Sequence, residues 1–150
     1  MTYNALDIAK SIILCTDVER GDTISNLKLQ KLLYYLQGYW LVIFNKPLFE
    51  EDIEAWMYGP VVPSVYEYFK GYGSRAIMPD DVSETEELSF DEDEGDLFVN
   101  VLEEYGQFSA VKLMEMTHSE LPWKSVATGK GNVISHDSLV KYFSTQVENV

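Results

Sequence analysis

The sequence is poor in cysteine, and this scarcity limits what the protein can be. Its one cysteine, Cys15, cannot form an intramolecular disulfide, which is typical of a protein from a reducing compartment. Because Cys15 follows the apolar residues Ile12, Ile13 and Leu14, we expect a buried, unreactive thiol rather than a reactive one. A chain of 150 residues can bury about two thirds of its unfolded surface without covalent cross-links.

The sequence also lacks a long apolar run and a basic leader. No stretch reaches the roughly 18 uncharged apolar residues that a membrane-spanning helix requires. The first segment has no basic region, and Asp7 and Lys10 interrupt its apolar residues, unlike a secretory signal peptide. We therefore expect a cytoplasmic protein that does not bind a membrane.

Basic residues are few. The chain carries 11 Lys and Arg against 25 Asp and Glu, which gives a formal net charge of −14. Most of such a surface repels phosphate backbones, and no cluster of Lys and Arg offers a local exception. We therefore expect no direct nucleic-acid binding. The acidic balance suits either a solvated surface or a basic protein partner.

Motifs for metals and cofactors are missing. His118 and His136 have no ligand partners at zinc spacing. The run Asp91-x-Asp93-x-Gly95 resembles a calcium loop only faintly, because its glycine comes one place early and its twelfth position is Leu102. The chain also lacks a complete phosphate loop, a GxSxG motif and a dinucleotide fingerprint. We expect no metal and no cofactor.

Catalytic residues are not singled out either. His118 stands beside Ser119 and Glu120 and could serve as a general base. A histidine at the end of a helix more often bonds to backbone carbonyl groups. We therefore expect a protein that is not an enzyme, with a hydrolase that uses His118 and nearby acids as an alternative.

Residues 27–45 are the segment around which we expect the fold to be organised. Their apolar residues follow the three-and-four spacing of a helix and then spread almost all round it, which is typical of a buried helix. Ser25 is a candidate N-cap, and Pro47 lies just beyond the end. Gly38 weakens this helix, and a close crossing with another helix would explain its presence. The fold class is therefore mainly α: one compact domain, residues 1–150, around this helix.

The remaining elements are shorter. Helical patterns occupy residues 4–17, 65–70, 97–105, 110–117 and 138–146, and the link at 117–123 is polar. We expect at most a small β-hairpin or short extended segments near residues 53–58 and 86–90. Residues 79–96 contain ten acids in eighteen positions, which predicts an acidic loop. Tyr and Trp are too numerous to be buried in one core, so we expect some of them to form a binding surface.

Three segments together resemble a known family. They are LKLQKLLYYLQGYWLVIFNKPLF at residues 27–49, DIEAWMYGPVVPSVYEYFKGYG at residues 52–73, and THSELPWKSV at residues 117–126, followed by Ile134 and Ser135. In this order and spacing they resemble the Panacea antitoxin domain, the family of SocA-like and phage-associated GepA-like proteins. The resemblance covers nearly the whole chain apart from residues 79–96.

The resemblance implies a helical antitoxin that neutralises a cognate protein toxin, encoded nearby, by direct binding. The alternatives are a phage-associated accessory protein that binds a host protein, and an adaptor that delivers a toxin to a protease. A homodimer is also left open. The candidate toxin-binding positions that match the family are Gln30, Lys31, Tyr34, Trp56, Tyr58, Gly59, Pro60, His118 and Trp123. For each of them the alternative is a structural role, such as a turn at Gly59 and Pro60.

Overall fold

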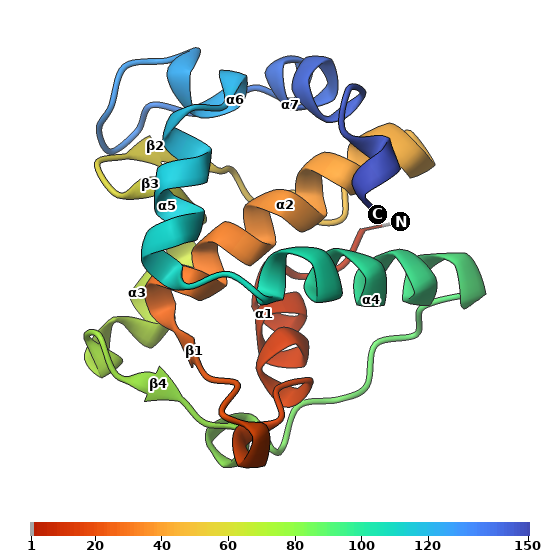
Figure 1. Ribbon diagram of the computed structural model, residues 1–150, viewed down its shortest axis with the longest axis vertical. Helices are drawn as coiled ribbons and strands as arrows, with labels where there is room; N and C mark the ends of the chain where they lie inside the picture. The colour runs from red at the N-terminus through yellow and green to blue at the C-terminus, as the bar shows by residue number, and fades with distance from the viewer. Residues whose placement is uncertain (1) are drawn as a thin grey trace.

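A computed structural model describes residues 2–150 and shows a mainly helical protein built around one central helix (Figure 1). This helix, α2, spans Asn26–Phe44 and contacts α1, α3, α4, α5 and α7. The other helices are α1 (Ala5–Leu14), α3 (Pro63–Phe69), α4 (Glu92–Gly106), α5 (Ala110–His118), α6 (Leu121–Lys124) and α7 (His136–Phe143). The predicted fold class and the central position of residues 27–45 are confirmed.

The described chain also contains two small antiparallel sheets and four short 3-10 helices, at Val18–Arg20, Lys70–Tyr72, Pro79–Val82 and Val147–Asn149. In one sheet, β1 (Ile24–Ser25) pairs with β4 (Ala76–Ile77), and in the other, β2 (Glu54–Trp56) pairs with β3 (Gly59–Val61). The second sheet is the hairpin expected near residues 53–58, extended by three residues past the turn. The first sheet was not predicted, because strands of two residues leave no periodicity in a sequence.

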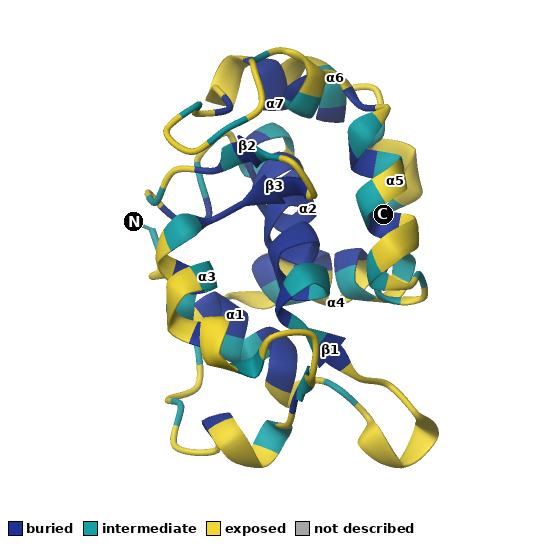
Figure 2. Cartoon of the chain, turned by 90° about the vertical axis from the view of Figure 1, so that its left-hand side faces the viewer, coloured by how far each residue is buried: buried dark blue, intermediate teal, exposed yellow. Residues whose placement is uncertain are grey.

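The cap and the glycine that the sequence of the central helix contains act as predicted. The side chain of Ser25 accepts a hydrogen bond from the backbone N–H of Lys28, as an N-cap does, and Asn45 ends the helix in the left-handed conformation with φ 55°. A methyl group at Gly38 would collide with the ring of Phe143, so α7 crosses α2 at this glycine. Figure 2 shows α2 as the most deeply buried helix.

The acidic segment differs from its prediction at its C-terminal end, where α4 begins. Residues 86–90 form no strand; instead Phe90 packs against the rings of Tyr3, Trp40 and Phe98. The last acids of the run belong to α4, which begins at Glu92 rather than at 97. Asp91 and Glu94 form a reciprocal capping box, and acidic side chains in a first turn are favoured by the helix dipole. A high density of acids therefore marks a helix start here as well as a loop.

Four further expectations were wrong. The first helix ends at Leu14 rather than at 17, and Cys15, at its C-cap, is exposed rather than buried. The segment 117–123 is not merely a polar link, because α6 occupies Leu121–Lys124 with Pro122 in its first turn, where proline costs no hydrogen bond. The last helix, α7, starts at His136 behind the cap Ser135 and ends at Phe143. Within residues 2–150, no helix is both long and apolar enough to cross a membrane.

Candidate functional site: the β2–β3 hairpin

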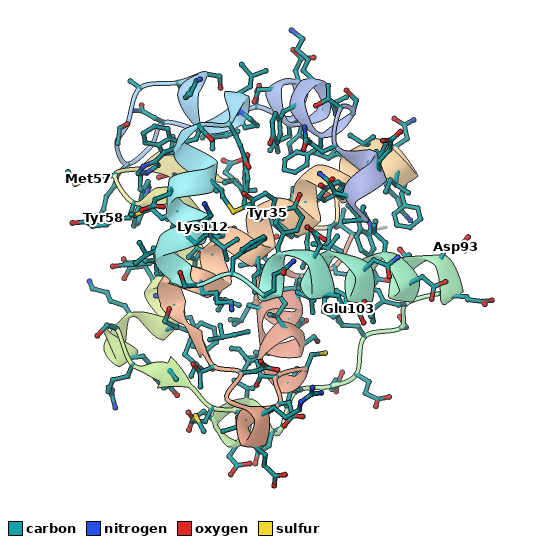
Figure 3. The ribbon with its side chains drawn as sticks, in the orientation of Figure 1. Tyr35, Met57, Tyr58, Asp93, Glu103 and Lys112 are labelled. Atoms are coloured by element: carbon teal, nitrogen blue, oxygen red, sulfur yellow. The ribbon has the colours of Figure 1, made fainter. Side chains whose placement is uncertain are left out.

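The hairpin carries the two most exposed large hydrophobic side chains in the described part of the chain. Trp56 pairs with Gly59 across a turn of two residues, Met57 and Tyr58. Met57 is 67% exposed and Tyr58 is 62% exposed. Figure 3 shows both side chains projecting outward, away from the body of the protein. Gly59 closes the turn with a backbone φ of +108°, which residues other than glycine rarely adopt.

The inner side of the hairpin rests on the central helix. The Nζ of Lys31 donates a hydrogen bond to the carbonyl oxygen of Pro60 at 3.0 Å, and the backbone N–H of Val62 donates to Oε1 of Gln30 at 2.9 Å. A methyl group at Gly59 would lie 2.6 Å from Cε of Lys31 and 2.9 Å from Oγ1 of Thr117. Burial lowers the pKa of Lys31 to about 7. The turn therefore sits directly on α2 and α5 without intervening space.

The outer strand is supported by the loop before α7. The backbone N–H of Ala55 donates to the carbonyl of Asn132 at 3.0 Å, and that of Gly129 donates to the carbonyl of Ala55 at 2.8 Å. One oxygen of Glu54 accepts from Nε1 of Trp56 and from the backbone N–H of Gly131. These bonds fix the backbone of β2, so Met57 and Tyr58, which follow it directly, project from a rigid strand.

An aromatic cluster lies beside the hairpin. The Nε1 of Trp123 donates to the carbonyl of Trp56 at 2.8 Å, and the ring of His118 stacks on Trp123 with 4.2 Å between centroids. The ammonium of Lys130 lies 5.3 Å from the centroid of the half-buried Trp56 ring. Nε2 of His118 is buried and has no hydrogen-bond partner among residues 2–150. Aromatic rings with an adjacent cation suit protein recognition.

Glu120, which the sequence places near His118, takes part in a different cluster. Its two oxygens accept hydrogen bonds from the hydroxyl groups of Tyr34, at 2.9 Å, and Tyr35, at 2.8 Å. Burial raises the pKa of Glu120, and the hydrogen bonds from these tyrosines oppose that rise. The ring of Tyr35 stacks on Tyr105 at 3.9 Å. Glu120 therefore ties α6 to the central helix, and these bonds occupy the carboxylate that a His118 mechanism would use.

The structure brings most of the predicted site residues together. Lys31, Gly59, Pro60, His118 and Trp123 surround or form the hairpin, together with Trp56 and Tyr58. Gln30 touches the end of β3 through Val62, whereas Tyr34 lies apart from the hairpin with Glu120. Of the predicted residues Tyr58 alone is exposed. Trp56, His118 and Trp123 are half-buried, and Gln30, Lys31, Tyr34, Gly59 and Pro60 are buried. Their part in toxin binding stays a prediction.

Sequence reasoning missed two members of this surface, Met57 and Lys130. Met57 reads as one residue of an alternating strand, and the signal that it lies in a turn is the Gly59-Pro60 pair two residues later. Lys130 lies far along the chain in a flexible-looking stretch, and only the fold brings it to Trp56. In the described residues, no three His, Cys, Asp or Glu side chains are grouped closely enough to hold a metal ion.

The hairpin lies within the part of the chain that matches a known family. The sequence model of the family described as "Antitoxin SocA-like, Panacea domain" matches residues 29–124, so the chain belongs to this family, as its three segments predicted. Antitoxin SocA from Caulobacter vibrioides (strain NA1000 / CB15N) is 39% identical over 117 residues, which cover 72% of this chain and 62% of that protein. The chain thus spans less than two thirds of the length of this relative. No solved structure matches the chain.

Proposed function

We propose that this protein is an antitoxin that neutralises a cognate protein toxin by binding it directly, without turnover. Membership of the SocA-like family supports the antitoxin role, and the exposed hairpin supports the direct binding. The observation that carries the proposal is the pair Met57 and Tyr58, which expose apolar and aromatic surface at the tip of a rigidly held turn.

The tip of the hairpin has the properties of a binding hot spot. Because the backbone of this turn is already fixed, binding costs little backbone entropy, and the apolar area of the two exposed side chains contributes more efficiently to affinity. Tyr is enriched in such positions because its ring is large and its hydroxyl can still bond to a partner. The half-buried Trp56 ring and the ammonium of Lys130 form the border of the same surface.

The experiment is a growth assay. The adjacent reading frame is expressed alone and together with this protein, and the purified pair is then examined by size-exclusion chromatography. We expect growth arrest by the neighbour alone, rescue by this protein, and elution as one complex. A harmless neighbour, or a toxic one that is not rescued, would overturn the proposal.

A matched pair of variants then tests the hairpin. Met57→Ser with Tyr58→Ser should abolish rescue and weaken the complex by at least a hundredfold. The control combines Ile43→Ser with Tyr68→Ser, which are 44% and 57% exposed on α2 and α3. The control removes similar apolar surface and should rescue growth normally. Equal behaviour of the two double variants would show that the toxin binds elsewhere.

A further inference from the structure

A groove of about 490 Å³ lies between α1, α2 and α4. Figure 1 shows that these three helices meet on a different part of the molecule from β2 and β3. Its lining includes the apolar side chains Ile12, Ile24, Leu32 and Leu102. Val99, which is 49% exposed, and the exposed Cys15 also line it. The groove can therefore take an apolar side chain from outside the molecule.

The polar border of the groove is electronegative. The helices α1 and α4 both end beside it, and neither has a basic residue in its last turn to offset the negative end of the helix dipole. Asp22 and Glu103 add two carboxylates, and neither forms a salt bridge within residues 2–150. Figure 3 shows Glu103 on the side of α4 that faces α1.

One lysine, Lys28, lies in the groove, but its charge is already engaged. Its Nζ donates a hydrogen bond to the carbonyl oxygen of Gly106 at 2.7 Å, at the end of α4. This bond compensates one terminal carbonyl of α4, and the charge of Lys28 also acts on Asp22. The last turn of α1 contains no basic residue, and Glu103 forms no salt bridge within residues 2–150. A positive group supplied from outside would therefore find favourable partners on both sides of the groove.

Further acidic residues near the groove add to its negative charge. No Lys or Arg occurs between Arg75 and Lys112, whereas this stretch contains twelve Asp and Glu residues. On α4, Glu92, Asp93 and Asp96 are exposed, and Asp93 projects outward at the far end of the helix (Figure 3). Such a field attracts a basic partner and speeds its association.

We propose that this groove is a second docking site for the toxin, and that it receives a basic segment of the toxin. An apolar side chain of that segment fills the floor, and a flanking Lys or Arg lies against Glu103, Asp22 and the end of α1. The proposal rests on the proposed function, because the occupant belongs to the same toxin. The two sites are connected through α2, which carries Lys28 and Leu32 of the groove and also Lys31, the residue that holds the hairpin.

The single cysteine provides the test. Cys15 is exposed at the border of the groove, and no other residue of the chain reacts with a thiol reagent such as 5,5′-dithiobis(2-nitrobenzoic acid). The rate of its reaction is measured for the free protein and for its purified complex with the product of the adjacent reading frame, with cysteines of that product replaced by serine. We expect at least a tenfold slower reaction in the complex.

Charge variants supply an independent measurement. Asp22→Asn with Glu103→Gln should lower affinity for the toxin about tenfold at low salt, and this difference should shrink as ionic strength rises. Glu92→Gln is the control, because it removes a carboxylate of the same helix roughly 16 Å away, at 1.5 Å of rise per residue. We expect the control to change affinity less than twofold.

The outcomes separate this inference from the proposed function. A stable complex in which Cys15 reacts as fast as in the free protein would overturn the second docking site and leave the antitoxin role intact. Equal effects of the double variant and Glu92→Gln would reduce the groove to part of a general acidic field and would also overturn it. A neighbour that does not bind at all would overturn both proposals.

Discussion

The buried ammonium group of Lys31 donates a hydrogen bond to the carbonyl oxygen of Pro60, 3.0 Å away. This contact joins the centre of the fold to the hairpin, because Lys31 belongs to the central helix and Pro60 to β3. The side chain is fully buried, and burial lowers its pKa to about 7. Burying a charged group without a counter-ion costs stability, so the burial of Lys31 makes the stability of the fold depend on pH.

The first prediction concerns this pH dependence. Lys31 has a pKa of about 7 in the folded protein and about 10.4 when unfolded, so the unfolded chain binds more protons between these values. The free energy of unfolding should therefore rise from pH 7 to pH 9, with a contribution on the order of 1 kcal/mol per pH unit. Lys31→Met should remove that contribution. Urea unfolding at pH 7, 8 and 9 measures it, and an unchanged slope in the variant would contradict it.

A second prediction concerns Gly59. Its φ of +108° and the closeness of Lys31 and Thr117 leave no room for a side chain. Gly59→Ala should therefore lower the free energy of unfolding by about 1–3 kcal/mol, the usual cost of such backbone strain. Gly71→Ala is the matched control, because no atom lies within 4 Å of its added methyl group. Both variants are compared by chemical denaturation, and equal stability of the two would show that the turn relaxes freely.

The third prediction concerns the tyrosines that bind Glu120. Tyr35→Phe removes a hydrogen bond of 2.8 Å to a buried carboxylate, so it should lower the free energy of unfolding by about 1–3 kcal/mol. The loss of a donor should raise the pKa of Glu120 further, so the loss of stability should grow as pH rises above the acidic range. Tyr68→Phe removes an exposed hydroxyl and should be neutral. Thermal unfolding at pH 5 and pH 7 measures both variants.

Much of the fold could be predicted from the sequence because the central helix has strong local signals. The cap at Ser25, the apolar spacing of residues 29–43 and the crossing glycine Gly38 all point to one buried helix, and the structure confirms each of them. The start of α4 could not be predicted in the same way. The start of α4 depends on a capping box between Asp91 and Glu94, which lies inside a run of acids that reads as a solvated loop.

The candidate site was only partly predictable, because burial depends on contacts between distant segments. Lys31 and Gln30 look like surface residues in sequence, but the hairpin covers them and uses their polar atoms to bind its own backbone. Glu120 looks like a neighbour of His118, but two tyrosines of α2 take up its carboxylate. Polar residues on a helix that is apolar on most sides are thus better read as anchors for backbone than as exposed ligands.

The last prediction joins the rigidity of the hairpin to binding. Trp123→Phe keeps an aromatic ring beside His118 but removes the hydrogen bond from Nε1 to the carbonyl of Trp56. The fold should lose only about 1 kcal/mol, the typical net worth of such a bond, while the hairpin becomes more mobile. Ordering it on binding should then cost affinity, so the toxin should dissociate about tenfold faster.

Hydrogen exchange of the Ala55 amide and surface plasmon resonance measure the two effects. Tyr66→Phe, which keeps the edge contact with Trp56, is the control. Faster exchange without faster dissociation would mean that the toxin does not bind the tip of the hairpin.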